Sequence, residues 1–248
     1  MKALLKKPFP FHTGPKAEGY LLSAMNLWNT PLSLWGLSAV SLPEDAEILD
    51  IGCCGGKNLQ RLLEKAPKGH VSGIDSSFRA VDFSYRLNEE AIREGRISVY
   101  EGAADVLPFN KDKFDFILAE ETFYFWKDPA ACLKEVLRVL KPGGTFLLLQ
   151  SKGGSPLHQV YEKLIPGMKV YSKGELKEFL EDAGFRDVTI RSRLGALAVS
   201  SEKPVTPLDA ARKKLKLSSI PYGKLTAAAL SAAALGLAAY GASRKYRS

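Results

Sequence analysis

The sequence is poor in cysteine and histidine, with three of each among 248 residues. Two of the cysteines, Cys53 and Cys54, are adjacent, and the third is Cys132. This excludes a disulfide framework and a zinc site built from paired Cys-x-x-Cys motifs. We therefore expect no metal site and a reducing, cytoplasmic environment. A secretory leader is not expected either, because prolines interrupt the basic opening segment and no apolar run follows it.

Most of the chain also lacks an excess of charge of either sign. Residues 203–248 contain nine basic residues and one acid, which alone gives the +8 net charge of the whole chain. Residues 1–202 are balanced, with 26 basic and 26 acidic residues. Proteins that bind nucleic acid usually carry a basic surface on their folded body. The sequence therefore predicts no nucleic-acid partner.

Short apolar segments alternate with helical segments from residue 47 onward. This alternation is typical of a doubly wound α/β fold, and we predict a Rossmann-like sheet of seven strands. A Lys-Pro-Gly-Gly segment at 141–144 predicts a helix stop and a turn before the fifth strand. The strands are expected at 47–51, 70–74, 97–101, 114–119, 145–150, 186–192 and 195–201, and the helices at 56–65, 77–93, 129–140 and 173–183.

The chain divides into four parts by composition. Residues 1–44 form a predicted helical cap, in which two helices over 17–40 break at Thr30-Pro31 and either pack on the domain or cover a ligand as a lid. The α/β domain follows at 45–203. A basic, proline-containing linker is expected at 204–223, and a hydrophobic helix with a basic end at 224–248.

The hydrophobic helix allows two interpretations. Residues 225–242 carry no charge and would span about 27 Å as a helix, close to the roughly 30 Å of a bilayer core. Basic residues flank them, with the longer flank at 212–224, which favours an anchor holding the α/β domain at the cytoplasmic face of a membrane. Nine of the 18 residues are alanine, so a helix that packs on the domain or on a second protomer is the alternative. The oligomeric state is not predicted.

A glycine-rich loop joins the first strand to the first helix of the α/β domain. Asp50 ends the strand, and the loop runs from Gly52 to Gly56. Such a loop allows close approach of backbone to a ligand and directs helix N-terminal amides at a negative group. Its spacing differs from the dinucleotide fingerprint and from a P-loop, which disfavours a nicotinamide-dependent oxidoreductase. A tight strand-to-helix turn without a ligand is the alternative.

Acidic residues follow the next two strands. Asp75 ends the second strand, where an acid typically holds a ribose diol, although Asp75 or Ser76 could instead cap the helix that follows. Asp105 follows the third strand and could accept a hydrogen bond from an adenine amino group. After the fourth strand come Glu120, Glu121 and four aromatic residues within the segment 120–126. Core packing is the alternative for Phe123 and Phe125.

These four blocks, in this order and spacing over residues 44–202, resemble a class I S-adenosylmethionine-dependent methyltransferase. The segments MNLWNTPLSLWGL (25–37), GGKN (55–58) and EETFYFW (120–126) further resemble a bacterial group with an unassigned small-molecule substrate. The resemblance implies that the loop contacts the methionine part of the cofactor, Asp75 the ribose, Ala104 and Asp105 the adenine, and Glu120–Thr122 the sulfonium. The residues expected to contact the cofactor are Asp50, Gly52, Cys53, Cys54, Gly55, Gly56, Asn58, Asp75, Ser76, Ala104, Asp105, Val106 and Glu120.

Two residues depart from the family pattern. Cys54 replaces the middle glycine of the loop and would be strained if this position needs a positive φ. Asn29 stands where the family has a histidine, which removes a titratable group.

The expected reaction is methyl transfer to a small-molecule acceptor by in-line displacement, and the acceptor is expected to be lipid-associated if residues 225–242 form an anchor. The candidates for a general base are Glu120, Glu121, Tyr124 and His158. The alternative, favoured by Cys54 and Asn29, is a degenerate, non-catalytic protein of this fold that binds at a membrane.

Overall fold

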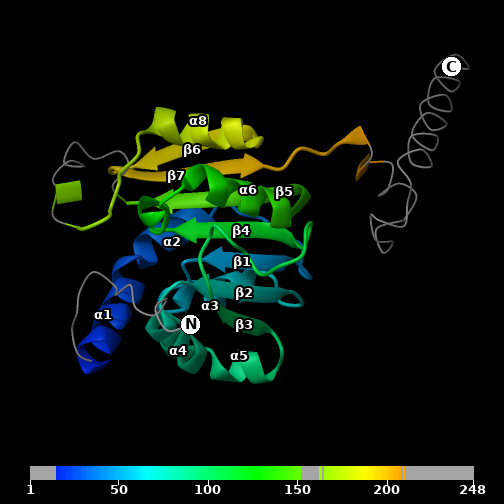
Figure 1. The fold of residues 1–248 in the computed structure, drawn as a ribbon. Coiled ribbons are helices and arrows are strands. Elements are labelled where there is room, and N and C mark those ends of the chain that lie inside the picture. The colour runs from blue at the N-terminus through cyan, green and yellow to red at the C-terminus, as the bar shows by residue number, and fades with distance from the viewer. Residues whose placement is uncertain (1–14, 152–161, 164, 208, 211–248) are drawn as a thin grey trace, which may run out of the picture. The chain divides into compact units, whose positions relative to one another are not determined.

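The computed structural model describes residues 15–151, 162–163, 165–207 and 209–210 (Figure 1). Contacts within the chain separate residues 1–203 from residues 204–248. Within the described residues, no helix is long and apolar enough to cross a membrane. The hydrophobic segment 225–242 lies outside the described residues, and so does His158.

A seven-stranded sheet with helices on both faces forms the centre of the domain, which confirms the predicted fold (Figure 1). The strand order is β3-β2-β1-β4-β5-β7-β6, with β7 antiparallel to both of its neighbours. The strands are β1 (Glu47–Ile51), β2 (His70–Asp75), β3 (Ile97–Glu101), β4 (Phe114–Glu120), β5 (Leu140–Gln150), β6 (Arg186–Arg193) and β7 (Ala196–Glu202). The helices are α1 (Pro15–Trp28), α2 (Thr30–Leu37), α3 (Lys57–Lys65), α4 (Phe78–Leu87), α5 (Glu89–Arg93), the short 3₁₀ helix η1 (Phe123–Phe125), α6 (Pro129–Val139) and α8 (Lys173–Ala183).

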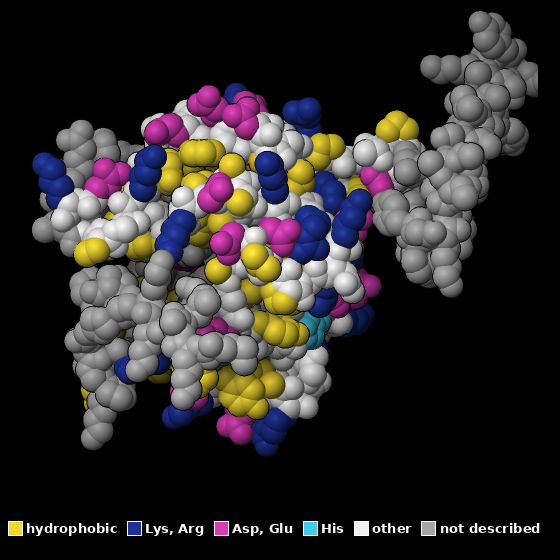
Figure 2. Space-filling model, in the orientation of Figure 1, with side chains coloured by type: hydrophobic (Ala, Val, Ile, Leu, Met, Phe, Trp, Pro, Cys, Tyr) yellow, Lys and Arg dark blue, Asp and Glu magenta, His cyan; other side chains and the backbone are white. Residues whose placement is uncertain are grey.

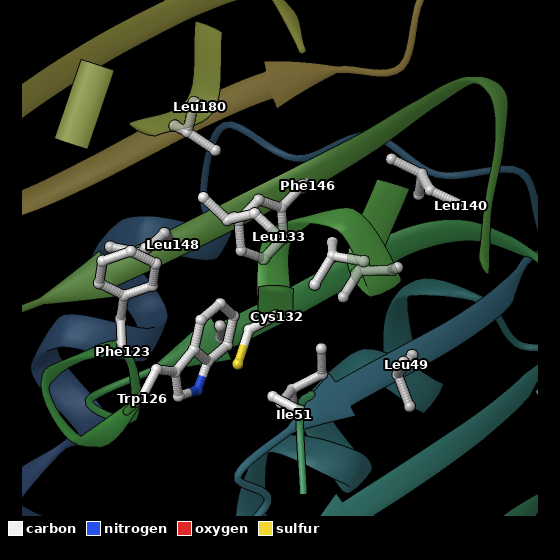
Figure 3. Packing of buried hydrophobic residues seen from close by; sticks show 14 of the residues in the cluster. Leu49, Ile51, Phe123, Trp126, Cys132, Leu133, Leu140, Phe146, Leu148 and Leu180 are labelled. Atoms are coloured by element: carbon white, nitrogen blue, oxygen red, sulfur yellow. The ribbon is translucent and has the colours of Figure 1, made fainter. Parts of the chain in front are cut away.

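Two hydrophobic cores lie on opposite faces of this sheet. Along β4, Ile117 and Ala119 belong to the core that contains residues of α6 and α8. Phe116 and Leu118 belong to the other core, which contains residues of α2 and α3. Successive strand residues point to opposite faces, so Glu120 is directed toward α2 and α3. Figure 3 shows part of the first core, with Phe123 and Trp126 beside α6.

The structure corrects three local predictions. The helix expected over 77–93 is split at Asn88, whose buried amide donates hydrogen bonds to the carbonyls of Ser84 and Gly56. The turn expected at 141–144 is extended and belongs to β5, because Gly143 and Gly144 pair with the backbone of Lys203. The break between the first two helices lies at Asn29, and Pro31 sits in the first turn of α2, where its missing N–H is tolerated.

The charged side chains on the visible face are mixed in sign (Figure 2). Lysine and arginine side chains alternate there with aspartate and glutamate side chains and form no extended patch of one sign. This agrees with the balance of charges in residues 1–202.

Candidate active site

The loop between β1 and α3 is held in an unusual backbone conformation. Gly52, Cys54 and Gly56 all have positive φ angles, of 76°, 51° and 75°. The amides of Gly52 and Cys53 both donate to the carbonyl of Ile74 at the end of β2, which fixes the loop to the sheet. The position of Cys54 therefore does require a left-handed backbone, which a non-glycine residue adopts only at a cost of about 1 kcal/mol or more.

Asp75 ties the same loop to the start of α4. Its Oδ2 accepts a hydrogen bond from the Cys54 amide and its Oδ1 accepts one from the Ser77 amide, both at 2.9 Å. Burial raises the pKa of Asp75, and the hydrogen bonds from the backbone oppose that rise. The cap of α4 is Ser77 rather than Asp75 or Ser76. A carboxylate has about four acceptor positions, so Asp75 retains capacity for a ribose diol.

Glu120 is the centre of a buried polar cluster at the carboxyl end of β4. The Ser33 hydroxyl of α2 lies 2.8 Å from both carboxylate oxygens, and the Asn58 amide of α3 donates to Oε2. Arg61 donates to Asn58 Oδ1 at 2.8 Å and, at 3.3 Å, to the Ser33 hydroxyl. The side chains of two helices from separate parts of the sequence thus meet on one carboxylate.

Burial raises the pKa of Glu120 to about 7, against an ordinary value of 4.5. The folded state therefore holds this proton more tightly than the unfolded state. It follows that the free energy of unfolding falls as the pH rises from about 4.5 to 7, by up to about 3 kcal/mol from this group.

We expect Glu120→Gln to remove most of this dependence. Denaturant unfolding at pH 5 and pH 8 should show a loss of stability in the wild type that is about 2 kcal/mol larger than in the variant. Glu135→Gln is the matched control. Arg138 holds the pKa of Glu135 below its usual range, so that carboxyl titrates below pH 5 and the control should keep the wild-type dependence. Equal losses in the wild type and Glu120→Gln would contradict the prediction.

Glu121 has different partners from its neighbour. It has a positive φ of 56°, and its carboxylate accepts hydrogen bonds from the Ser151 amide, from the Ser151 hydroxyl and from the Tyr124 hydroxyl. Ser151 directly follows β5. The two adjacent acids therefore hold different elements: Glu120 contacts α2 and α3, whereas Glu121 contacts η1 and the residue after β5.

The first two helices are attached to the site by polar contacts as well as by packing. Asn26 of α1 donates to the Gly55 carbonyl at 3.0 Å, and Arg61 donates to Thr30 at the start of α2. At the other end of α2, Arg191 of β6 donates to the Gly36 carbonyl at 2.9 Å. The cap thus covers the glycine-rich loop, and α2 is additionally fixed to the far half of the sheet.

A small polar cavity of about 30 Å³ remains between the cap and the loop. It is lined by Met25, Asn26, Asn29, Ser33, Gly52, Cys53, Cys54, Asn58, Arg61 and Glu120. Asp50 is 1% exposed, and its Oδ2 has no hydrogen-bond partner within the described part of the chain. Burial raises the pKa of Asp50 well above its usual value, and the negative charges of Glu120 and Asp75 add to this effect.

This donor and acceptor set fits a cationic cofactor. S-adenosylmethionine carries an ammonium group and a sulfonium. A cation beside the loop would lower the raised pKa values of Asp50 and Glu120 and so favour their negatively charged forms. The cavity itself has room for no more than a few water molecules, so the cap or the side chains under it must move to admit the amino-acid part of the cofactor.

The remaining predicted residues lie at the same edge of the sheet. Ala104 is buried, whereas Asp105 and Val106 are exposed after β3, Val106 by 73%. Tyr124 is buried at 1% exposure, as is Phe123, which confirms the core-packing alternative for Phe123. Phe125 is 43% exposed and does not belong to the core.

The sequence did not predict Ser33, Arg61 or Gln150 as residues of the site. Ser33 and Arg61 lie inside helices without a local motif, and only the fold brings them to Glu120. Gln150 ends β5, and both polar atoms of its buried amide lack a hydrogen-bond partner among the described residues. The only signal in the sequence was its position, a polar residue at the end of an apolar strand.

Comparisons with known proteins agree with this geometry. The family model of a methyltransferase domain matches residues 49–148. An uncharacterized methyltransferase of Bacillus subtilis, YdaC, is 24% identical over 126 residues, which is 51% of this chain and 66% of that protein. The chain thus spans just under two thirds of the length of that relative. A demethylmenaquinone methyltransferase of Staphylococcus aureus is 29% identical over 177 residues, 60% of this chain and 72% of that protein.

The fold also matches solved structures. A SAM-dependent methyltransferase of Aquifex aeolicus superposes with a TM-score of 0.62 at 24% identity, over 77% of this chain and 99% of that one. The sequence match covers the part of this chain that contains the glycine-rich loop and Asp75 at the end of β2.

Proposed function

Because this chain is a class I S-adenosylmethionine-dependent methyltransferase, we propose that it transfers the methyl group to a small, apolar acceptor associated with lipid. The observation that carries the proposal is the contact between the glycine-rich loop and the segment that follows β4. A side chain on Gly52 would come within 2.7 Å of Thr122 Cβ, so the loop directly contacts the segment that carries η1. The aromatic residues Phe123–Trp126 begin directly after Thr122, the residue that the loop contacts.

The similarity to a relative named for demethylmenaquinone supports an apolar acceptor. Phe125 offers an exposed apolar surface at this edge, and the unpartnered amide of Gln150 offers hydrogen bonds to a polar atom of the acceptor. An acceptor with an apolar body and one or two polar oxygens fits this combination.

The chain's own residues orient the reactants. When bound, S-adenosylmethionine supplies an electrophilic methyl group with a good leaving group, so positioning can account for much of the catalysis. We assign the ribose to Asp75, the adenine to the segment 104–106, and the methionine part to the loop with Asp50, Asn58 and Glu120. A base is needed only for an acceptor that arrives protonated. We assign that role to Glu121, whose carboxylate accepts a hydrogen bond from the Tyr124 hydroxyl.

The C-terminal part of the chain extends the proposal to the membrane. The uncharged segment 225–242 with basic residues on both sides is suited to an anchor that holds the enzyme at the cytoplasmic face. Full-length protein that stays in the soluble fraction after cell lysis would exclude this anchor.

The second candidate is a non-catalytic protein of the same fold, and the backbone of Cys54 favours it. A side chain at a φ of 51° projects from a loop that otherwise uses glycine at its left-handed positions. A loop that can no longer accept the cofactor would leave a scaffold that binds an apolar ligand without turnover.

Calorimetric titration with S-adenosylmethionine separates the two candidates. For the methyltransferase we expect micromolar binding by the wild type, and transfer of labelled methyl to demethylmenaquinone or a shorter quinol. Cys54→Gly should bind at least as tightly, because glycine relieves a backbone strain of about 1 kcal/mol. Binding by Cys54→Gly alone would favour the non-catalytic scaffold, and no binding by either folded protein would contradict the assignment of this site to S-adenosylmethionine.

A further inference from the structure

The outer face of the N-terminal helix pair is apolar and exposed. Tyr20, Leu27 and Trp28 of α1 are 78%, 74% and 78% exposed, and Leu34 of α2 is 58% exposed. We call these four residues the cap face. Soluble domains rarely expose several large apolar side chains together, and such patches usually mark an interaction surface.

The fold does not need these side chains for its own packing. Tyr20 and Leu27 are seven residues apart and so share one side of α1. Leu22 of α1 is 5% exposed, and Leu32 and Leu37 of α2 are 8% and 3% exposed. The buried residues thus fix the helices to the domain, and the cap face remains on the solvent side.

The cap face also has no charge to keep it in water. Between Glu18 and Glu44 the sequence contains no aspartate, glutamate, lysine or arginine. A segment of this length on a soluble surface would ordinarily carry about six charged residues at the usual frequency of one in four. Exposed tryptophan and tyrosine on an uncharged helical surface are typical of proteins that contact the membrane interface.

Two further exposed side chains lie at the same edge of the sheet. Phe125 follows β4, and Leu194, which is 98% exposed, lies in the turn between β6 and β7. Gln150 pairs with Leu197 near the start of β7, so this turn lies at the carboxyl ends of β4 and β5. The glycine-rich loop and the cap face lie at this edge as well, because Asn26 of α1 binds Gly55.

We propose that the cap face inserts into the surface of a bilayer that contains anionic lipid. The charge of the chain selects this partner, because residues 203–248 carry nine basic side chains and one acid, and such segments are attracted to anionic headgroups. Shallow apolar insertion and a basic segment together give a stable peripheral attachment, where either one alone is weak. Attachment of this kind would place the site edge against the lipid from which an apolar acceptor is drawn.

Quenching of tryptophan fluorescence by brominated acyl chains tests this proposal on the full-length protein. The chain has three tryptophans. Trp126 is buried and Trp35 lies under Arg191, so Trp28 is the one on the cap face. With vesicles of brominated phosphatidylcholine and phosphatidylglycerol, we expect quenching in the wild type and its loss in Trp28→Phe. This readout is local, so it reports on the cap face even if residues 225–242 also enter the bilayer.

A pair of double variants measures the contribution of the cap face to binding. Leu27→Ser with Trp28→Ser should weaken sedimentation with these vesicles about tenfold. Tyr85→Ser with Leu87→Ser is the matched control, because these apolar side chains are 47% and 39% exposed on the last turn of α4 and do not belong to the cap face. The control should bind as the wild type does.

Three results would overturn the proposal. The protein could fail to bind the vesicles, or it could bind without quenching of Trp28, which would assign all attachment to the C-terminal segment. A lipid-free dimer that the cap-face double variant abolishes would show that a second copy of this chain occupies the face instead. None of these outcomes depends on the identity of the methyl acceptor or on turnover.

Discussion

Asp75→Ala should raise the dissociation constant for S-adenosylmethionine at least about 100-fold. Asp75 accepts hydrogen bonds from the amides of Cys54 and Ser77, and in the proposed site it also accepts those of the ribose diol. Hydrogen bonds to a charged group contribute about 1.5–3 kcal/mol each, and a loss of about 2.7 kcal/mol corresponds to a factor of 100. Because two buried amides lose their acceptor, the free energy of unfolding should also fall by about 2–4 kcal/mol.

Asp82→Ala is the control for this experiment. Asp82 lies on α4 and pairs with Arg86 at the surface, so its removal takes away a nearby negative charge without disturbing the loop. Isothermal titration of both variants, on samples shown by circular dichroism to be folded, checks the prediction. Wild-type affinity in a folded Asp75→Ala protein would exclude Asp75 from the cofactor site.

Gly52→Ala should destabilise the protein by about 2–5 kcal/mol and abolish cofactor binding at accessible concentrations. Gly52 has a φ of 76°, and an added Cβ would lie 2.7 Å from Thr122 Cβ. The backbone strain costs about 1–2 kcal/mol, and the collision with a neighbour that β4 holds in place adds about 1–3 kcal/mol. Relief of the collision would push the glycine-rich loop away from Thr122 and η1, and so would separate the two segments that form the site.

Gly95→Ala separates the two contributions. Gly95 has a similar φ of 72°, but an added Cβ would meet no atom within 4 Å. Denaturant unfolding should therefore show a loss of only about 1–2 kcal/mol in Gly95→Ala, with cofactor affinity unchanged. Equal losses in the two variants would mean that the contact between Gly52 and Thr122 contributes nothing to stability.

The sequence predicted the sheet because its signals were local. Apolar runs such as 114–119 and 145–150 and the glycine-rich loop each occupy a few consecutive residues, and the order of such segments limits a doubly wound fold to few topologies. The same locality placed Asp50, Asp75 and Glu120 at strand ends, which meet at one edge of a parallel sheet. The φ angle of Cys54 was also foreseeable, because the family pattern has glycine at that position.

The site residues and element bounds that the sequence did not predict depend on contacts across the fold. Ser33 and Arg61 are separated from Glu120 by 87 and 59 positions in the chain, and no periodicity in α2 or α3 marks them as site residues. The division of helix 77–93 at Asn88 depends on the carbonyl of Gly56, a partner outside the helix. The extension of β5 back to Leu140 depends on pairing with Phe114 and Lys203, which a Pro-Gly-Gly sequence does not reveal.

The position of Glu120 at the end of β4 makes the site sensitive to whether the strand changes in length by an odd or an even number of residues. Glu120 is directed toward α2 and α3 because side chains alternate along β4, so that it shares a face with Phe116 and Leu118. Deletion of one residue from β4 would turn Glu120 to the face of α6 and α8, whereas deletion of two would shorten the strand and keep Glu120 on its own face. Length variation in this strand among related proteins should therefore come in steps of two residues, while the segments before β4 and after η1 are free to change by one.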